Sequence, residues 1–176
     1  MSTLTSRPMS LVHVDFNELY ARHLCRHSQF GINAVHLVAL FGVWFGIYGI
    51  VYWLARLLMV EAWWVPVGMA IAYVAVLAPN TPLRVLVATA AFVALMVAAL
   101  LALPELPAWI LAVYVVAILV SYKIQNVSHR WFPVENDMTE FNKKYVKGST
   151  LFLVLLFYEV PIALNYLVYG RKDWRA

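Results

Sequence analysis

The feature that most constrains the fold of this chain is a series of long apolar segments with almost no charge. The segments are residues 37–55, 62–79, 85–103, 106–122 and 150–169. The first four contain no Asp, Glu, Lys or Arg, and the last contains only Glu159. About 20 consecutive apolar residues suffice for a helix to cross a bilayer, and a helix satisfies its own backbone hydrogen bonds there. The sequence therefore predicts an all-α, polytopic membrane helix bundle with about five transmembrane helices, forming a single domain over residues 1–176.

Composition agrees with a membrane protein and argues against a nucleic-acid partner. Hydrophobic residues make up 64% of the 176 residues and charged residues only 12%, whereas a soluble domain carries about a quarter charged residues. The basic residues are spread along the ends of the apolar segments and form no stripe with interleaved aromatic residues. The expected partner is the lipid bilayer.

The N-terminal segment is expected to be an interfacial helix over residues 11–30. Its first half is interrupted by Asp15, Asn17 and Glu18, so it lacks the apolar core of a secretory signal. No proline or glycine occurs between residues 11 and 29, and Gly31 then offers a turn before the first span.

The distribution of basic residues predicts the orientation. The N-terminal segment and the loop over residues 123–149 are both basic, and cytoplasmic loops carry an excess of Lys and Arg. Both are therefore expected on the cytoplasmic face of a bacterial inner membrane, or of the endoplasmic reticulum. A fifth crossing would place the basic tail, which includes Arg171 and Lys172, on the opposite face. Pro161 inside the last segment could break or kink it, so whether this segment crosses fully stays open.

Histidines gather where the chain meets this face. His23 and His27 are spaced i, i+4, so a helix would place them side by side, and His36 opens the first span. His129 follows Gln125 by four residues at the end of the fourth span, in a helix that should stop near Pro133. Neutral imidazoles suit iron, zinc or manganese. The histidines either decorate an interfacial helix as polar side chains or form a metal site, and in the second interpretation the four expected ligands are His23, His27, His36 and His129.

Glu159 is the second unusual residue, because an ionisable group inside a span usually faces a protein interior. One interpretation is a structural hydrogen bond to Tyr158, Asn165 or a tyrosine of another span. The other is that it holds a ligand histidine in one tautomer, although a position ten residues into a span lies about 15 Å from the interface. Three further carboxylates have no assigned role: Glu135, Asp137 and Glu140.

The spacing of these residues resembles a known family. The pattern H-x5-N-x2-H is formed by His27, Asn33 and His36, and Q-x3-H by Gln125 and His129, followed by a glutamate in the last apolar segment. This arrangement is similar to a small integral-membrane family that includes the fungal iron-dependent 2-hydroxy fatty acid dioxygenase. The chain departs from the family in three places. The family's first histidine is one residue closer to the asparagine, its second-half histidine is usually preceded by glycine where this chain has Ser128, and that histidine is usually followed soon by a glutamate, where this chain has Pro133 and only later Glu135.

The resemblance implies an Fe(II) ion held by His27, His36 and His129, with Asn33 and Gln125 orienting ligands or substrate. A 2-hydroxy acid would chelate the iron through its carboxylate and hydroxyl, leaving a position for O2. Cleavage next to the carboxylate would release a chain one carbon shorter.

Three functional hypotheses follow. The first is a membrane-embedded non-haem oxygenase that uses Fe(II), or another divalent metal, and O2 on a lipid or fatty acid, with Asn33, Gln125 and Glu159 as catalytic candidates. The alternative is a non-catalytic transporter or assembly subunit with a polar path around Glu159. The third is a metal-free lipid-modifying enzyme that uses a carboxylate and His129 as acid and base. Ser128 and His129 are sequence neighbours, which does not make them a nucleophile pair. The sequence indicates no oligomeric state.

Overall fold

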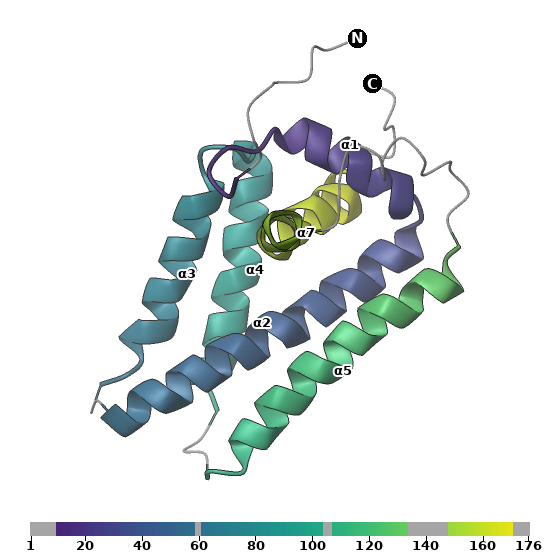
Figure 1. Cartoon of the computed structure of the whole chain (residues 1–176). Coiled ribbons are helices and arrows are strands. Elements are labelled where there is room, and N and C mark those ends of the chain that lie inside the picture. The colour runs from purple at the N-terminus through teal and green to yellow at the C-terminus, as the bar shows by residue number, and fades with distance from the viewer. Residues whose placement is uncertain (1–9, 59–60, 104–106, 134–147, 171–176) are drawn as a thin grey trace.

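The computed structural model describes residues 10–58, 61–103, 107–133 and 148–170. The helices, in chain order, are α1 (Phe16–Arg26), α2 (Phe30–Leu58), α3 (Trp64–Leu77), α4 (Leu83–Leu101), α5 (Ile110–Trp131) and α7 (Ser149–Tyr169) (Figure 1). The described part of the chain contains no strand, only one isolated bridge between Ser10 and His13. The predicted all-α membrane bundle is confirmed.

Among the described residues, four helices, not five, are long and apolar enough to cross a membrane. They are α2, α4, α5 and α7. The predicted span over residues 62–79 is the 14-residue helix α3, about 21 Å long at 1.5 Å per residue, against a hydrocarbon core of about 30 Å. Two prolines explain its length. Pro66 lies in the first turn, where a helix tolerates proline, and α3 ends at Leu77 shortly before Pro79, which has no backbone N–H to continue it.

A seam of small residues joins α2 to α5 at close range. A Cβ atom added at Gly46 would lie 2.7 Å from the carbonyl oxygen of Tyr114, and one at Gly49 would meet the Tyr114 ring. Gly42 faces Ser121 in the same way. Only residues without bulk let two helix backbones approach this closely. The two helices run antiparallel and side by side in Figure 1, so this register, continued toward the start of α2, brings His36 against Ser128.

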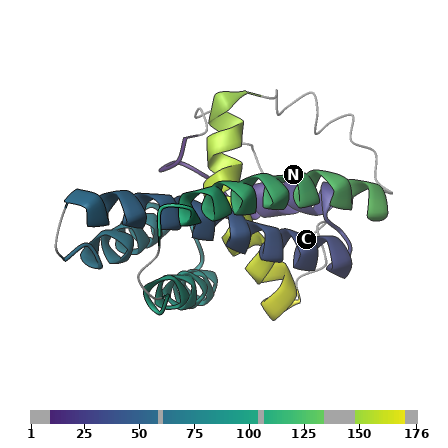
Figure 2. The ribbon, with the colours of Figure 1, turned by 90° about the horizontal axis from the view of Figure 1, so that it is seen from below.

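Helix α7 runs across the other apolar helices. In Figure 1 it points largely toward the viewer while α2, α3, α4 and α5 lie in the picture plane, and Figure 2 shows it crossing them after a 90° turn. Its tyrosines anchor it along its length. The hydroxyl of Tyr158 donates to the carbonyl of Leu11, and that of Tyr169 donates to the carbonyl of Arg84. The middle of α7 therefore lies at the same end of the bundle as α1.

Pro161 does not end α7, which continues to Tyr169. Proline has no N–H, so the carbonyl of Phe157, four residues earlier, loses its helical partner. The hydroxyl of Tyr73 on α3 donates to that carbonyl at 2.6 Å and replaces the missing bond. Pro161 thus leaves the helix unbroken, and its missing bond ties α7 to α3.

The N-terminal helix is shorter than the predicted 11–30. Asp15 caps α1 by accepting a hydrogen bond from the N–H of Glu18, and the helix ends at Arg26. Its buried residues recur at helical spacing along one face: Phe16, Leu19, Tyr20, His23 and Leu24. This face lies against the rest of the bundle and carries His23 inward.

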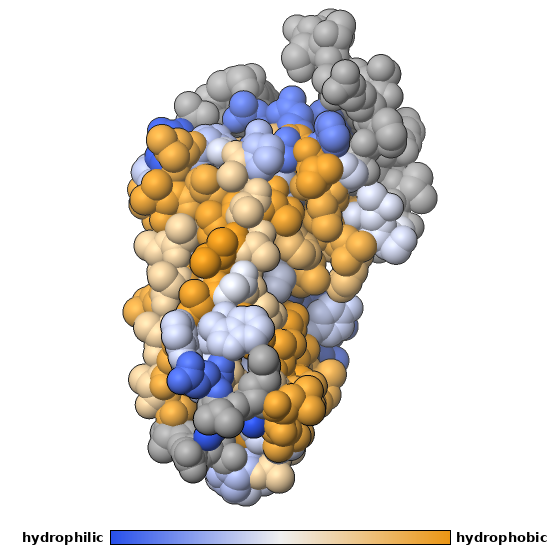
Figure 3. Space-filling view, turned by 90° about the vertical axis from the view of Figure 1, so that its left-hand side faces the viewer, coloured by the Kyte–Doolittle hydropathy of each residue, from blue (hydrophilic) through white to orange (hydrophobic). Residues whose placement is uncertain are grey.

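The molecular surface has the hydropathy expected of a protein in a bilayer. Figure 3 shows apolar side chains covering the middle of one face, with hydrophilic side chains gathered toward its upper and lower parts. Large apolar side chains such as Val38, Ile71 and Leu95 are more than half exposed. In water such exposure would be costly over so wide an area, whereas among lipid tails it is not.

Candidate metal centre

The first two histidines of the cluster lie on α1 and in the turn that follows it. The sequence spacing predicted that His27 shares a helix with His23, but His27 is the C-cap of α1, with φ of −130° and ψ of 46°, outside the helical region. The turn falls at residues 27–29, and Gly31 is already part of α2. The two imidazoles still lie face to face, with ring centroids 3.8 Å apart and planes inclined by 9°.

Side chains hold the backbone of this turn. The amide of Asn33 donates to the carbonyl oxygens of His27 at 2.6 Å and Gln29 at 2.8 Å. The hydroxyl of Tyr166 on α7 donates to the carbonyl of Ser28 at 2.8 Å. Asn33 is fully buried. The Asn33 side chain therefore fixes the position of His27. Asn33 was expected among the catalytic candidates, and the contact that the structure shows for it is a structural one.

The two long helices contribute the other histidines. His36 lies on the second turn of α2 and His129 near the end of α5, which stops at Trp131, just before Pro133 as predicted. The ring of His27 is 4.4 Å from that of His36 and 4.9 Å from that of His129, and the last two are 5.1 Å apart. Three separate segments thus bring the four predicted histidines into one cluster.

Glu159 reaches this cluster from α7. Its Oε1 lies 2.7 Å from Nδ1 of His36, and its side chain is 17% exposed. The expected depth of about 15 Å does not keep Glu159 from the histidines, because α7 runs across the other apolar helices (Figures 1 and 2) and its carboxylate meets His36. Tyr158 and Asn165, its predicted structural partners, are not bonded to it in the described structure; Tyr158 bonds instead to Leu11 and Asn80.

The donor atoms fit a metal ion. Two sets of three ligand atoms lie within 4.8 Å of one another: His27, His36 and His129 form one, and His23, His27 and Glu159 the other. Nε2 of His23, Nε2 of His27 and Nδ1 of His129 are buried and have no hydrogen-bond partner among the described residues. An unpartnered buried polar group is costly. A cation in the first set would satisfy the nitrogens of His27 and His129, and one in the second set would satisfy that of His23.

Burial also keeps the first two imidazoles neutral. It lowers the pKa of His23 to about 4, partly offset by the Glu159 carboxylate. Burial likewise lowers the pKa of His27 well below its usual value, and the neighbouring His23 lowers it further. The neutral imidazole is the form that binds a metal ion. Both residues are therefore ready to act as ligands at neutral pH.

A small cavity of about 50 Å³ opens beside the cluster, between α1 and the first half of α7. Its lining residues are Leu19, Arg22, His23, Arg26, His27, Leu151, Leu155 and Glu159. A water molecule occupies about 30 Å³ in the liquid. The cavity therefore has room for an ion or a very small polar group beside the histidines, and its outer walls combine two arginines with two leucines.

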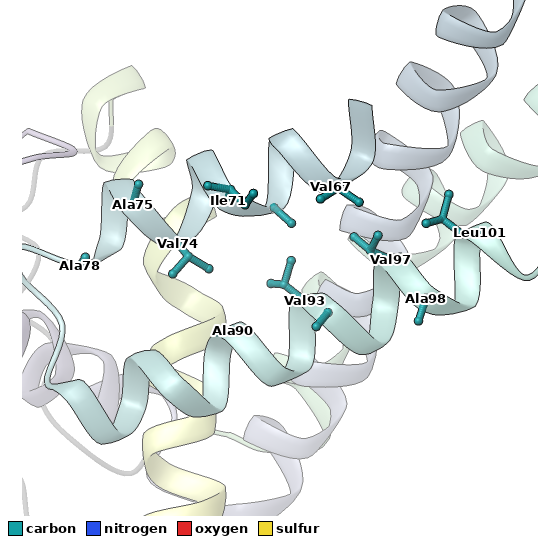
Figure 4. Close-up of a pocket in the computed structure, with 12 residues that line it drawn as sticks. Val67, Ile71, Val74, Ala75, Ala78, Ala90, Val93, Val97, Ala98 and Leu101 are labelled. Atoms are coloured by element: carbon teal, nitrogen blue, oxygen red, sulfur yellow. The ribbon is translucent and has the colours of Figure 1, made fainter. Parts of the chain in front are cut away.

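A larger hollow, about 660 Å³, lies elsewhere, between α3 and α4 (Figure 4). Its walls are formed by Val, Ala, Ile and Leu side chains alone, such as Val67, Val74 and Val97. It contains no group that could bind a metal or transfer a proton. Within a bilayer, such a groove is a place for lipid tails and not for chemistry.

Sequence reasoning missed one member of the cluster and could not place others. Ser128 is fully buried, and its Oγ lies 3.1 Å from Nε2 of His36. Its partner is thus on another helix and is not the adjacent His129. The side-chain amide nitrogen of Gln125 is buried near the end of α5 without a hydrogen-bond partner in the described segments. The carboxylates Glu135, Asp137 and Glu140 lie outside the described residues.

The fold and the cluster together define a helical membrane protein with a buried histidine and glutamate centre. In comparisons with known proteins, no family model, no curated protein and no solved structure matches the chain.

Proposed function

We propose that this chain is a membrane-embedded, non-haem metal-dependent oxygenase that acts on a lipid or fatty acid. The observation that carries the proposal is the convergence of four histidines and one glutamate, three of whose ring nitrogens are buried without partners among the described residues. Such a set of neutral nitrogen donors without thiolates favours iron, zinc or manganese over the softer metals.

The ligand set that best fits the contacts is His27, His36 and His129, with His23 beside them. Glu159 would fix the ring of His36 by accepting from its Nδ1, which leaves Nε2 for the metal. Asn33 would hold His27 in place through its carbonyl oxygen. A bound Fe(II) would supply a centre for O2 chemistry, and the chain would supply its position and shield it from bulk water.

The resemblance to the 2-hydroxy fatty acid dioxygenase family suggests the substrate class. A fatty acid has a small polar head, which suits a cavity of about 50 Å³, and a long tail that can remain among lipid tails beside Leu151 and Leu155. Arg22 and Arg26 line the same cavity, and their charge would favour an anionic head group. We place this end of the bundle at the cytoplasmic face, on the basis of its basic residues.

The transporter hypothesis rests on Glu159, and substitutions distinguish it from a metalloenzyme. A transporter requires Glu159 and tolerates replacement of the histidines, whereas a metalloenzyme requires the histidines first. The bond between Glu159 and His36 gives the carboxylate a role in the cluster, so we favour the metalloenzyme. In the third hypothesis His129 acts as acid and base, and then O2 would not be consumed at all.

Oxygen uptake tests the proposal. The purified protein, loaded anaerobically with Fe(II) in mild detergent, is given a 2-hydroxy fatty acid and O2 consumption is recorded. The matched substrate is the same acid without its hydroxyl, and the matched variants are His36→Ala and His13→Ala, since His13 is exposed and lies outside the cluster.

We expect O2 uptake with the hydroxy acid, a product one carbon shorter, and loss of both in His36→Ala but not in His13→Ala. Iron-loaded protein that consumes no O2 with any fatty acid, or equal activity in both variants, would refute the proposed oxygenase.

A further inference from the structure

We propose that Ser128 is a direct oxygen ligand of the same metal ion, beside His36. This inference rests on the metal centre proposed above and adds a neutral oxygen to its nitrogen donors. The side chain is fully buried on α5, and its Oγ lies 3.1 Å from Nε2 of His36 on α2. The register of the glycine seam between these helices sets the two atoms against each other.

The hydrogen bonds around His36 leave its Nε2 and the Oγ of Ser128 without a proton between them. Nδ1 of His36 faces the Glu159 carboxylate at 2.7 Å, so it carries the ring proton, and Nε2 then presents a lone pair. Ser128 has a single hydroxyl proton, which it donates to the carbonyl of Gln125 at 2.7 Å. Nitrogen and oxygen lone pairs therefore face each other at 3.1 Å, and a cation beside both atoms would satisfy them.

The separation of the two atoms matches neighbouring ligands on one ion. With metal–ligand bonds of about 2.1 Å, adjacent ligands are about 3.0 Å apart in an octahedron and about 3.4 Å apart in a tetrahedron. The observed 3.1 Å from Oγ to Nε2 is close to the octahedral edge. A serine or threonine hydroxyl binds Mg²⁺ in this way in phosphate-binding loops.

A different proton position would give a different chemistry. If the Ser128 hydroxyl turned toward His36, then Ser128, His36 and Glu159 would form a nucleophile, base and orienting carboxylate, as in serine hydrolases. A proton on Nε2 of His36 would also allow a hydrogen bond from this nitrogen to the Oγ of Ser128. Neither arrangement gives a partner to the three other buried ring nitrogens of the cluster. A metal ion held by His27, His36 and His129 accounts for two of them, those of His27 and His129, so the observations favour the ligand role.

The consequence is a specific coordination. Three imidazoles and one hydroxyl would occupy four positions of an octahedron and leave two for small oxygen ligands. A neutral oxygen donor also favours Fe(II) or Mn(II) over a closed tetrahedral zinc site. When a substrate chelates the ion, the weakly held hydroxyl is the protein ligand that would be displaced first.

Cobalt spectroscopy tests the inference without any substrate. Metal-free wild-type protein, Ser128→Ala and Ser128→Cys are titrated with Co(II) in detergent, and the visible and near-ultraviolet absorption is recorded. Ser121→Ala and Ser121→Cys are the matched controls, because Ser121 is a buried serine on the same helix that packs against Gly42 and lies outside the metal cluster.

We expect Ser128→Ala to bind Co(II) about tenfold more weakly and to show stronger visible bands, as the coordination number falls. Ser128→Cys should gain a sulfur-to-cobalt charge-transfer band that Ser121→Cys lacks. This gain of signal does not depend on the alanine variant folding well.

Each contrary result has a distinct meaning. If wild type binds Co(II) but the Ser128 variants match their Ser121 controls, only the ligand role of Ser128 is overturned. If wild type binds no Co(II), the metal centre itself fails. Covalent labelling of Ser128 by a fluorophosphonate would overturn the ligand role in favour of the nucleophile.

Discussion

Nδ1 of His36 lies 2.7 Å from Oε1 of Glu159, although 123 positions separate the two residues in the sequence. The contact joins α2 to α7 at the centre of the cluster and leaves Nε2 of His36 as the atom that faces Ser128. A carboxylate on the outer nitrogen of a metal-binding histidine fixes the tautomer and makes the ring a stronger ligand.

Removal of this carboxylate should weaken metal binding without unfolding the chain. We expect Glu159→Ala to lower the affinity for Fe(II) or Co(II) by about 10- to 100-fold, with Glu159→Gln between wild type and alanine because its amide oxygen still accepts from Nδ1. Competition with a coloured chelator measures the affinity. Glu61→Gln, an exposed glutamate after α2, is the control, and equal affinities for all variants would show that Glu159 does not support the metal.

Asn33 should matter for stability before it matters for chemistry. Its amide donates to two carbonyl oxygens of the buried turn that carries His27, and a buried carbonyl left without a partner costs about 1–3 kcal/mol. We expect Asn33→Ala to lower the thermal unfolding temperature in detergent and to reduce the number of bound metal ions per chain. Asn126→Ala removes an exposed amide of α5 and should change neither quantity. A stable Asn33→Ala variant with a full metal site would contradict this role.

Larger side chains at the glycines of α2 that contact α5, such as Gly46, should destabilise the protein. Gly46→Leu would drive a side chain into the Tyr114 carbonyl and Ile118, and overpacking of this kind costs about 1–3 kcal/mol or more. Because the seam also sets His36 against Ser128, we expect metal binding to be lost together with stability. Gly68→Leu is the control, since nothing lies within 4 Å of a Cβ at that position. Similar unfolding temperatures for the two variants would show that the α2–α5 register is not fixed by these glycines.

Acid should destabilise the metal-free protein through the buried histidines. The pKa of His23 is about 4 in the folded chain, below its ordinary value of 6.5, so the unfolded chain takes up this proton first as pH falls. The free energy of unfolding therefore decreases from about pH 6.5 toward pH 4, by about 1–2 kcal/mol at pH 5 from this residue. Denaturation curves at pH 7 and pH 5 measure the decrease, which should be smaller in His23→Gln than in His13→Gln. An equal decrease in both variants would exclude His23 as its source.

The sequence predicts the class of fold and most of the cluster, for clear physical reasons. Apolar runs report which segments avoid water, and the i, i+4 spacing of Gln125 and His129 survives because α5 is a regular helix up to Trp131. The short length of α3 could also have been predicted from Pro66 and Pro79, which lie near its two ends. The prediction of a full span used hydropathy alone, which does not take these prolines into account.

The contact between Glu159 and His36 could not be predicted from the sequence in the same way. Hydropathy measures how apolar a segment is and not its direction, so it cannot tell a helix that crosses from one that runs across the bundle. The direction of α7 depends on tertiary bonds from Tyr158, Tyr166 and Tyr169 to distant backbone carbonyls. Ser128 was missed for a related reason: its partner is set by the glycine seam and not by its sequence neighbour.

The central claim is that these residues hold one metal ion, and metal content tests it most directly. The protein is purified anaerobically in mild detergent as wild type, His27→Ala, His129→Ala and His13→Ala, and iron, zinc and manganese per chain are quantified by mass spectrometry. We predict close to one equivalent of a divalent metal in wild type and His13→Ala, and its loss in both cluster variants. Folded wild-type protein without metal, or equal metal content in all four proteins, would contradict the account.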